Sequence, residues 1–299
     1  MVRSIFQKMS TCTKPLWSIT ELSRRVHRVS FDNVGSNGER WILVTADHHV
    51  DNVKCRRDII KRHMDEARER NAPVFLFGDT FCAMQGKWDR RADQNQLRPE
   101  HRGNNYLDLL KKEVAEFYDP YADQIALITQ GNHETSILDR HQTDLTACLV
   151  DRLRNDGERQ VCLGGYQGWV EFAMARKGGN HYTKTLCYHH GYGGGGAVTR
   201  GMIDNSRTRD QYDADIFVSG HVHWKNADLN VVTSLGRAGK IHKKQQLFLR
   251  CGSYKDEDDG WHVAQGRASR PLGGWWIKLT LRRQGAEEWI EMDHMSTST

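Results

Sequence analysis

Three short and wholly apolar runs constrain what this 299-residue chain can fold into. They are Trp41–Val44, Val74–Phe77 and Ile125–Ile128, and polar residues follow each of them at once. Short apolar strands that alternate with helices are typical of a parallel sheet covered on both faces. Apolar residues at helical spacing predict the intervening and following helices, at residues 56–70, 107–117 and 145–153. The first half of the chain is therefore predicted to be α/β.

The second half of the chain shows a different pattern, because strand-like runs follow one another with few helical signals between them. We expect strands at residues 169–175, 183–188, 216–218, 246–250, 275–281 and 288–292. No internal repeat is visible and no linker separates two cores. We therefore expect an N-terminal extension over residues 1–30, a single domain over 31–293 and a disordered tail over 294–299.

Composition excludes several classes of protein. Hydrophobic residues make up 38% of the chain, which suffices for a core, and the formal charge is only +5. No run of about 18 apolar residues predicts a transmembrane helix, and the N-terminus lacks the apolar segment of a secretory signal. The seven cysteines are odd in number and form no CxxC pair, which argues against a disulfide framework and a structural zinc knuckle. These features predict a cytoplasmic protein with reduced thiols and no membrane partner.

The residues that follow the predicted strands carry the strongest functional signal. Asp47 and His49 follow the first strand, Asp79 follows the second, and Asn132 and His133 follow the third. Two later strands end in the same way, in front of the histidines His189, His190, His221 and His223. Ligands of open α/β sheets bind at the carboxyl ends of the strands, so we expect these side chains to converge.

The converging residue types indicate a metal centre with two ions. Oxygen and imidazole donors without thiolates suit Mn, Fe, Zn or Ni rather than a structural zinc site. The donors are too many for one ion and about right for two. A shared carboxylate such as Asp79 could bridge ions roughly 3.5 to 4 Å apart, a spacing that holds one phosphate and the attacking water. The adjacent glycines allow sharp turns and close backbone approach at Gly78, Gly131, Gly191 and Gly220.

The ordered motifs resemble those of the calcineurin-like metallophosphoesterase superfamily. They are D-x-H at Asp47, G-D at Gly78, G-N-H-E at Gly131, a histidine before Gly191 and G-H-x-H at Gly220, and they span residues 47 to 223. The resemblance implies a metallophosphoesterase fold, which is a four-layer αββα sandwich of two mixed β-sheets flanked by helices. It also implies a dinuclear metal centre, with Mn favoured.

The resemblance implies a role for each motif residue. One metal would be held by Asp47, His49, Asp79 and His223, and the other by Asp79, Asn132, His190 and His221. His133 would touch the phosphate and help to protonate the leaving oxygen, and Glu134 would orient it. Two of the predicted ligands have an adjacent histidine that competes for the role. His49, and not His48, satisfies D-x-H, and His190, and not His189, directly precedes a glycine. The losing histidine would contact a ligand or the substrate.

The implied reaction is hydrolysis of a phosphate ester by a metal-bridging hydroxide. Protein Ser/Thr phosphatases carry Asp-Arg-Gly soon after the G-D motif, whereas here Thr80–Met84 follows, so protein phosphatase activity is not expected. The spelling G-D-x-F is closer to the DNA-repair exonuclease branch, but the His and Asn that follow it there are missing. We therefore predict a dinuclear metal-dependent phosphoesterase without a defined substrate.

Charged and glycine-rich stretches favour a phosphodiesterase that acts on nucleotides or nucleic acid. Trp88, Arg90 and Arg91 lie in a basic stretch that could meet a phosphodiester backbone, although a solvated loop or a subunit contact explains them equally well. Gly193 and Gly194 could cradle a phosphate, with a flexible turn as the simpler explanation. Residues 235–255 hold six Lys or Arg and no acidic residue, which suits a polyanion or an exposed strand pair. The alternatives are a phosphomonoesterase and a catalytically silent interaction scaffold.

Overall fold

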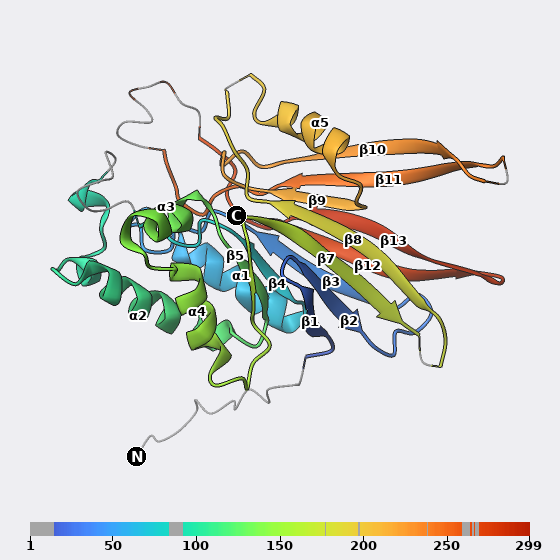
Figure 1. The fold of residues 1–299 in the computed structure, drawn as a ribbon, viewed down its shortest axis with the longest axis horizontal. Helices are drawn as coiled ribbons and strands as arrows, with labels where there is room; N and C mark the ends of the chain where they lie inside the picture. Colours follow the sequence, from blue (N-terminus) through green and yellow to red (C-terminus); the bar gives the residue numbers. More distant parts are fainter. Residues whose placement is uncertain are drawn as a thin grey trace, which may run out of the picture.

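The structure is a computed structural model, and it describes residues 15–83, 92–176, 178–196, 198–237, 239–258, 264, 266 and 269–299. Two mixed β-sheets stack face to face, and helices cover both outer faces (Figure 1). The predicted four-layer αββα sandwich is therefore confirmed. The layers are unequal, because among the described residues helices α1–α4 cover one sheet and α5 alone covers the other.

The six-stranded sheet contains the three apolar runs that the sequence predicts as parallel strands. Its order is β13-β12-β3-β4-β5-β6. The strands β3 to β6 are parallel, and β12 and β13 add an antiparallel edge. The bounds are β3 Glu39–Thr45, β4 Val74–Phe77, β5 Ile125–Thr129, β6 Cys162–Gly164, β12 Trp275–Gln284 and β13 Glu287–Ser296. The central strands are apolar on both faces because both faces are covered.

The seven-stranded sheet has the order β1-β2-β7-β8-β9-β11-β10 and mixes parallel with antiparallel pairs. Its bounds are β1 Ser18–Ser23, β2 Val26–Phe31, β7 Gln167–Ala175, β8 His181–His189, β9 Ile216–Ser219, β10 Asn226–Leu235 and β11 Ile241–Arg250. The second half of the chain is mostly strand, as expected. The helix α5 (Met202–Gln211) was not predicted, since it buries only Asn205 and so lacks an apolar face.

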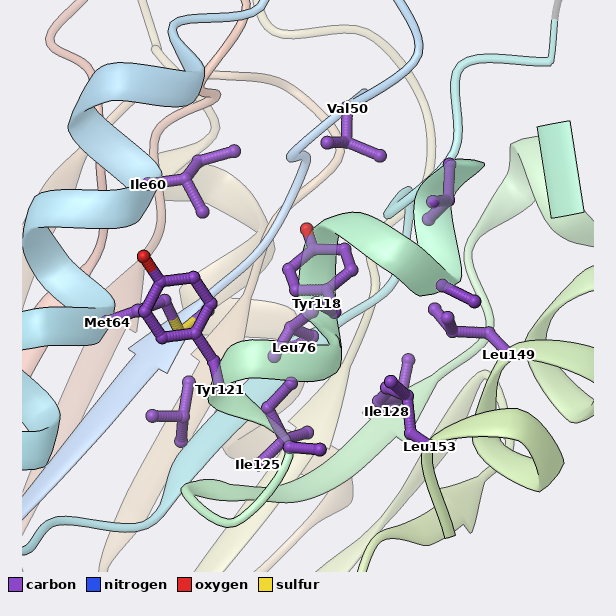
Figure 2. Close-up of a cluster of buried hydrophobic side chains, with 14 of the residues drawn as sticks. Val50, Ile60, Met64, Leu76, Tyr118, Tyr121, Ile125, Ile128, Leu149 and Leu153 are labelled. Carbon is purple, nitrogen blue, oxygen red and sulfur yellow. The ribbon is translucent and has the colours of Figure 1, made fainter. Parts of the chain in front are cut away.

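Four helices form the layer outside the six-stranded sheet. They are α1 (Arg57–Glu69), α2 (Tyr106–Tyr118), α3 (Asn132–His141) and α4 (Leu145–Arg154), with 3₁₀ turns at Gln94–Gln96, Pro99–His101 and Asp119–Tyr121. Figure 2 shows part of the core between these helices and the sheet, formed by Ile60, Met64, Tyr118, Leu149 and Leu153 against Leu76, Ile125 and Ile128. Among the described residues, no helix combines the length and the apolar character that crossing a membrane needs.

A second core fills the space between the two sheets. Leu76 packs against the helices, whereas its neighbour Phe77 packs between the sheets, because successive strand residues point to opposite faces. Phe77 stacks on Tyr188 of β8 with ring centroids 4.8 Å apart. Packing in this core fixes the position of one sheet relative to the other. As a result, β4 of the six-stranded sheet and β8 of the seven-stranded sheet end close to each other.

The chain ends differ from the predicted domain boundaries. Residues 18–31 form β1 and β2 of the seven-stranded sheet and are not an extension, and Val29 is fully buried between the sheets. β13 continues to Ser296, and Thr297 is buried and donates a hydrogen bond to the carbonyl of Gly274 at 3.1 Å, so this segment is not a disordered tail. The N-terminal strands could not be recognised locally, because β2 pairs with β7, about 140 residues away in the sequence. β13 pairs with its neighbour β12 and extends beyond the predicted strand at 288–292.

Candidate metal centre

All seven predicted ligands meet where strands of both sheets end. One group comprises Asp47, His49 and His223, and a second comprises Asp79, His190 and His221. Within each group the ligand atoms lie within 4.8 Å of one another. The seventh, Asn132 at the start of α3, reaches the second group through its side-chain oxygen. The parallel strands β3, β4, β5, β8 and β9 place these residues, as the sequence predicts.

The first group surrounds a buried carboxylate. Oδ2 of Asp47 accepts a hydrogen bond from the backbone amide of His221 at 2.8 Å. Oδ1 lies 3.6 Å from Nε2 of His223 and has no hydrogen-bond partner among the described residues. Nε2 of His223 also lies 3.2 Å from Nε2 of His49. Three donor atoms therefore face one small space.

In the second group, backbone carbonyls determine which imidazole nitrogen points inward. Nδ1 of His190 donates to the carbonyl of Phe77 at 2.9 Å, and Nε2 lies 3.1 Å from Oδ2 of Asp79. Nε2 of His221 donates to the carbonyl of Gly193 at 2.9 Å. Its Nδ1 then faces the side-chain oxygen of Asn132 at 2.7 Å. The inward nitrogens of both rings therefore face the oxygens of Asp79 and Asn132, where either a ring proton or a cation can lie between them.

The donor set fits two divalent cations. A buried carboxylate oxygen without a partner, such as Oδ1 of Asp47, costs about 1 to 3 kcal/mol, and a cation would remove that cost. Histidine ligands of metals commonly donate their other ring nitrogen to a carbonyl or carboxylate, as His190 and His221 do. Asp79 contacts His190 and lies beside His133, so its position is central.

The backbone at the centre adopts a conformation that side chains rarely take. Five candidate ligands have positive φ, namely Asp47 (53°), His49 (45°), Asp79 (49°), His221 (71°) and His223 (58°). Such residues cost free energy and cluster at functional sites. Two glycines permit the close packing of these loops, because a Cβ at Gly131 would meet Asp79 and one at Gly220 would meet Asp47.

His133 lies at the centre, but Glu134 does not orient it as the resemblance implies. Nδ1 of His133 contacts the carbonyl of Cys82, and Nε2 lies 3.7 Å from Oδ2 of Asp79. Glu134 instead accepts hydrogen bonds from the backbone amides of Gly131 (2.8 Å), Phe81 (2.9 Å) and Asp79 (3.1 Å). Its carboxylate therefore ties together the loops after β4 and β5, and the Cys82 carbonyl orients the His133 ring.

Burial and mutual charge shift the pKa values of these groups. Burial raises the pKa of Asp47 and lowers that of His49 far below its ordinary value. Burial also acts on Asp79, but the neighbouring His133 and His190 outweigh it and hold the pKa of Asp79 well below its usual range. Burial, followed by the charge of Asp79, raises the pKa of Glu134 to about 8.

The competing histidines point away from the two groups. Nδ1 of His48 contacts the hydroxyl of Tyr118 at 2.6 Å on the helical side of the sheet. Nδ1 of His189 accepts from the backbone amide of Gly191 at 3.0 Å, and its ring packs against Tyr166. The structure thus places His49 and His190, rather than their neighbours, with the other predicted ligands.

The predicted substrate contacts receive less support from the structure. Trp88, Arg90 and Arg91 lie outside the described residues. The carbonyl of Gly193 contacts His221, as described above, and that of Gly194 accepts from the amide of Gly196 at 3.1 Å. A phosphate-binding role for these glycines stays a prediction.

The basic stretch at 235–255 is not a basic surface beside the centre. Arg250 is buried and donates to the carbonyl of Gly201 at 2.9 Å, and buried Lys255 pairs with Glu257 at 2.9 Å. The other cations lie along the β10–β11 hairpin, which projects away from the helical layer (Figure 1). Its tip at Ile241 is nine residues from Arg250, or about 30 Å along the strand. The hairpin tip therefore cannot touch a phosphate held at the centre.

Two acidic residues at the centre were not predicted. Oε2 of Glu257 lies 3.5 Å from Nδ1 of His223. Asp51 accepts from the backbone amides of Cys82 and Ala83, and thereby fixes the carbonyl that contacts His133. Glu257 lies in an acidic run that, in the sequence, suggests only a partner for nearby basic residues. Asp51 follows the D-x-H motif by two positions, which was its only signal.

The fold and the site together define a class: an α/β sandwich of two mixed sheets with candidate dinuclear metal ligands at the strand ends. The resemblance to calcineurin-like metallophosphoesterases is thus confirmed at the level of the fold. No family model matches this chain, and no curated protein matches it either.

Several solved structures align with most of the chain at low similarity. Vacuolar Protein Sorting 29 from Cryptosporidium parvum is 14% identical, with 86% of this chain and 98% of that chain covered and a TM-score of 0.35. A metallophosphoesterase from Sphaerobacter thermophilus is 11% identical, with 86% and 89% covered and a TM-score of 0.34. GAP50, the anchor in the inner membrane complex of Plasmodium, is 9% identical, with 87% and 90% covered and a TM-score of 0.40. Any functional assignment therefore rests on the side chains of the site itself.

Proposed function

We propose that this protein is a dinuclear metal-dependent hydrolase of phosphate esters. The observation that carries the proposal is the pair of donor groups around Asp47 and Asp79, whose inward-facing atoms lie close enough to hold two cations. When bound, two divalent cations would supply positive charge for a phosphate and a water acidic enough to attack it. Mn is the proposed metal, as the family resemblance implies; the oxygen and imidazole donors suit it, as they also suit Fe, Zn and Ni.

The residues of the chain would provide positioning and a proton. His133 is held by its Nδ1 contact to the Cys82 carbonyl, so Nε2 is the nitrogen that can reach a substrate oxygen. A positioned imidazole is the usual general acid near neutral pH, and we assign His133 the protonation of the leaving oxygen. Nε2 also lies 3.7 Å from Oδ2 of Asp79, at the edge of the second donor group.

A pocket along α3 from His133, whose walls include none of the candidate ligands, is the feature on which we base the choice of a phosphodiester substrate. Its volume is about 590 Å³, and its walls come from residues 101–108 together with Leu97, Ile137 and His141. Ile137 and His141 follow His133 at helical spacing on α3, so they share its face, and the pocket begins about one turn from His133. A diester carries a second substituent, which this pocket would hold.

The chemistry of the pocket suits a nucleoside substituent. Arg102, Asn104 and Asn105 offer hydrogen bonds, while Tyr106 and Leu107 offer apolar surface. Ligand sites commonly combine apolar walls with a few such polar groups at this volume. The substrate class that we propose is therefore a nucleotide-type phosphodiester. The argument for this class now rests on the pocket and no longer on the basic β10–β11 hairpin.

The decisive experiment compares three substrates in the presence of Mn²⁺: a mono-aryl phosphate, a bis-aryl phosphate and single-stranded DNA. We expect the diesters to be hydrolysed, and Asp79→Asn to lower the rate at least about 10³-fold, since it removes several kcal/mol of charge stabilisation. Asp139→Asn, on an exposed position of α3, is the matched control. Metal analysis should find two ions per chain, and fewer in Asp79→Asn.

Other outcomes would replace the proposal. A preference for the monoester would identify a phosphomonoesterase. An absence of bound metal and of hydrolysis would favour the silent scaffold, although all seven donor positions are present in this chain.

A further inference from the structure

A third group of potential ligands lies beside the two described above, and it contains a thiol. Cys82, His49 and His133 each offer one atom, and these atoms lie within 4.8 Å of one another. All three side chains are buried. Cys82 is a free thiol that plays no part in the proposed hydrolysis.

The loop after β4 holds this thiol in place through its backbone. Asp51 accepts hydrogen bonds from the amides of Cys82 and Ala83, and Nδ2 of Asn52 donates to the sulfur of Cys82 at 3.3 Å. Burial outweighs this hydrogen bond and raises the pKa of the Cys82 thiol to about 12, so a bound cation must displace its proton. Nδ1 of His49 is buried, and His49 therefore retains a ring nitrogen without a hydrogen-bond partner among the described residues.

The donor types distinguish this group from the dinuclear centre. Two imidazoles and one thiolate suit zinc or cadmium, whereas each group of the dinuclear centre offers a carboxylate in place of the thiolate and so also accepts harder ions such as Mn²⁺. Around zinc, with bonds of about 2.0 to 2.3 Å, ligand atoms lie about 3.3 to 3.6 Å apart. The three atoms would therefore need to close by about 1 Å, which small side-chain rotations can provide.

We propose that Cys82, His49 and His133 form a third site, which shares His49 with the first group and takes a soft divalent cation, and that filling it inhibits the hydrolase. The inhibition rests on the proposed function, because it takes His133 away from the leaving oxygen and competes for His49. Binding of the cation to the three side chains does not depend on the proposed function. On binding, a sulfur–metal bond forms and the thiol proton passes to solvent, without any change of oxidation state.

Cobalt binding tests the site without an activity measurement. Titration of the metal-free protein with Co²⁺ should produce a thiolate-to-cobalt charge-transfer band in the near ultraviolet. Cys82→Ser should lack this band, whereas Cys148→Ser, on α4, should keep it. With zinc, X-ray absorption should show a sulfur neighbour at about 2.3 Å that Cys82→Ser loses. No band in the wild type, or an equal band in Cys82→Ser, would overturn the proposal.

Inhibition is measured separately in the Mn-loaded protein. We expect Zn²⁺ to inhibit hydrolysis, and Cys82→Ser to raise the half-inhibitory concentration at least about 10-fold, because a ligand is lost. Serine keeps the backbone contacts of residue 82 to Asp51 and His133, so positioning is preserved. Equal inhibition of both proteins would refute the inhibitory role. A Co²⁺ band in a protein without hydrolytic activity would instead refute the proposed function and leave the site standing.

Discussion

The carboxylate of Glu257 lies 3.5 Å from Nδ1 of His223, across the ring from the nitrogen that faces His49. The other oxygen of Glu257 contacts Nζ of Lys255 at 2.9 Å. Burial alone would raise the pKa of Glu257, but its contacts with His223 and Lys255 hold it far below the ordinary value. Glu257 is therefore an ionised carboxylate that orients the ring of a candidate ligand, His223.

Loss of this carboxylate should weaken metal binding. We expect Glu257→Gln to lower Mn²⁺ affinity about 10-fold, because partners that orient a ligand histidine are commonly worth 10- to 100-fold. Calorimetric titration of the metal-free protein measures the effect. Asp258→Asn, at the exposed neighbouring position, should bind as tightly as the wild type. Equal affinity in both variants would show that Glu257 does not act on the metal site.

Filling the pocket next to α3 should separate diester from monoester hydrolysis. His141→Trp places an indole in the pocket, and we expect kcat/KM for a dinucleotide to fall about 10- to 200-fold, as for other changes of pocket size. Activity on a mono-aryl phosphate should stay unchanged. Arg140→Trp, one position earlier and not in the pocket wall, is the control. A parallel loss on both substrates would remove the pocket from the binding site.

The N-terminal strands should contribute to global stability. Val29 of β2 is fully buried between the sheets, so Val29→Ala should lower the free energy of unfolding by about 2 kcal/mol. The adjacent Arg28→Ala removes only a half-exposed ion pair with Glu171, which is worth about 1 kcal/mol or less. Urea denaturation followed by tryptophan fluorescence compares the two. If Val29→Ala were neutral, residues 18–31 would not be part of the folded core.

Glu113 should make the protein less stable in acid. Its carboxylate accepts from Arg57 at 2.6 and 2.8 Å and lies 3.1 Å from Nε2 of His101. Burial opposes ionisation, but these partners outweigh it and hold the pKa of Glu113 at about 2. The unfolded chain takes up this proton near pH 4.3. The stabilisation is therefore complete above about pH 5 and is lost as the pH falls towards 2.

The variant Glu113→Gln isolates this effect. We expect the difference in unfolding free energy between pH 7 and pH 3 to be smaller by about 1 to 2 kcal/mol than in the wild type, allowing for solvent screening of a partly exposed group. Glu116→Gln, an exposed position on the same helix, should leave the difference unchanged. An unaltered pH dependence in Glu113→Gln would contradict the assigned pKa.

Local patterns were sufficient for the elements whose signals are local. The apolar runs that become β3, β4 and β5 are visible because both faces of each strand are buried, and the amphipathic face of α1 follows from its spacing. In contrast, β1 and β2 carry polar residues on their exposed faces and gain their place through pairing with β7. Such long-range pairing leaves no local signature.

The types of the seven candidate ligands and their position at strand ends were determined by the sequence alone, because parallel strands bring their carboxyl ends to one edge. Only the tertiary structure decided which way each ring points. The carbonyls of Phe77 and Gly193 turn one nitrogen of His190 and His221 inward, and Glu257 does the same for His223. These partners lie 28 to 113 residues from His221 and His190 in the chain, so no short motif can encode them. Hydrogen bonding across the folded molecule, rather than residue identity, makes these side chains a candidate metal centre.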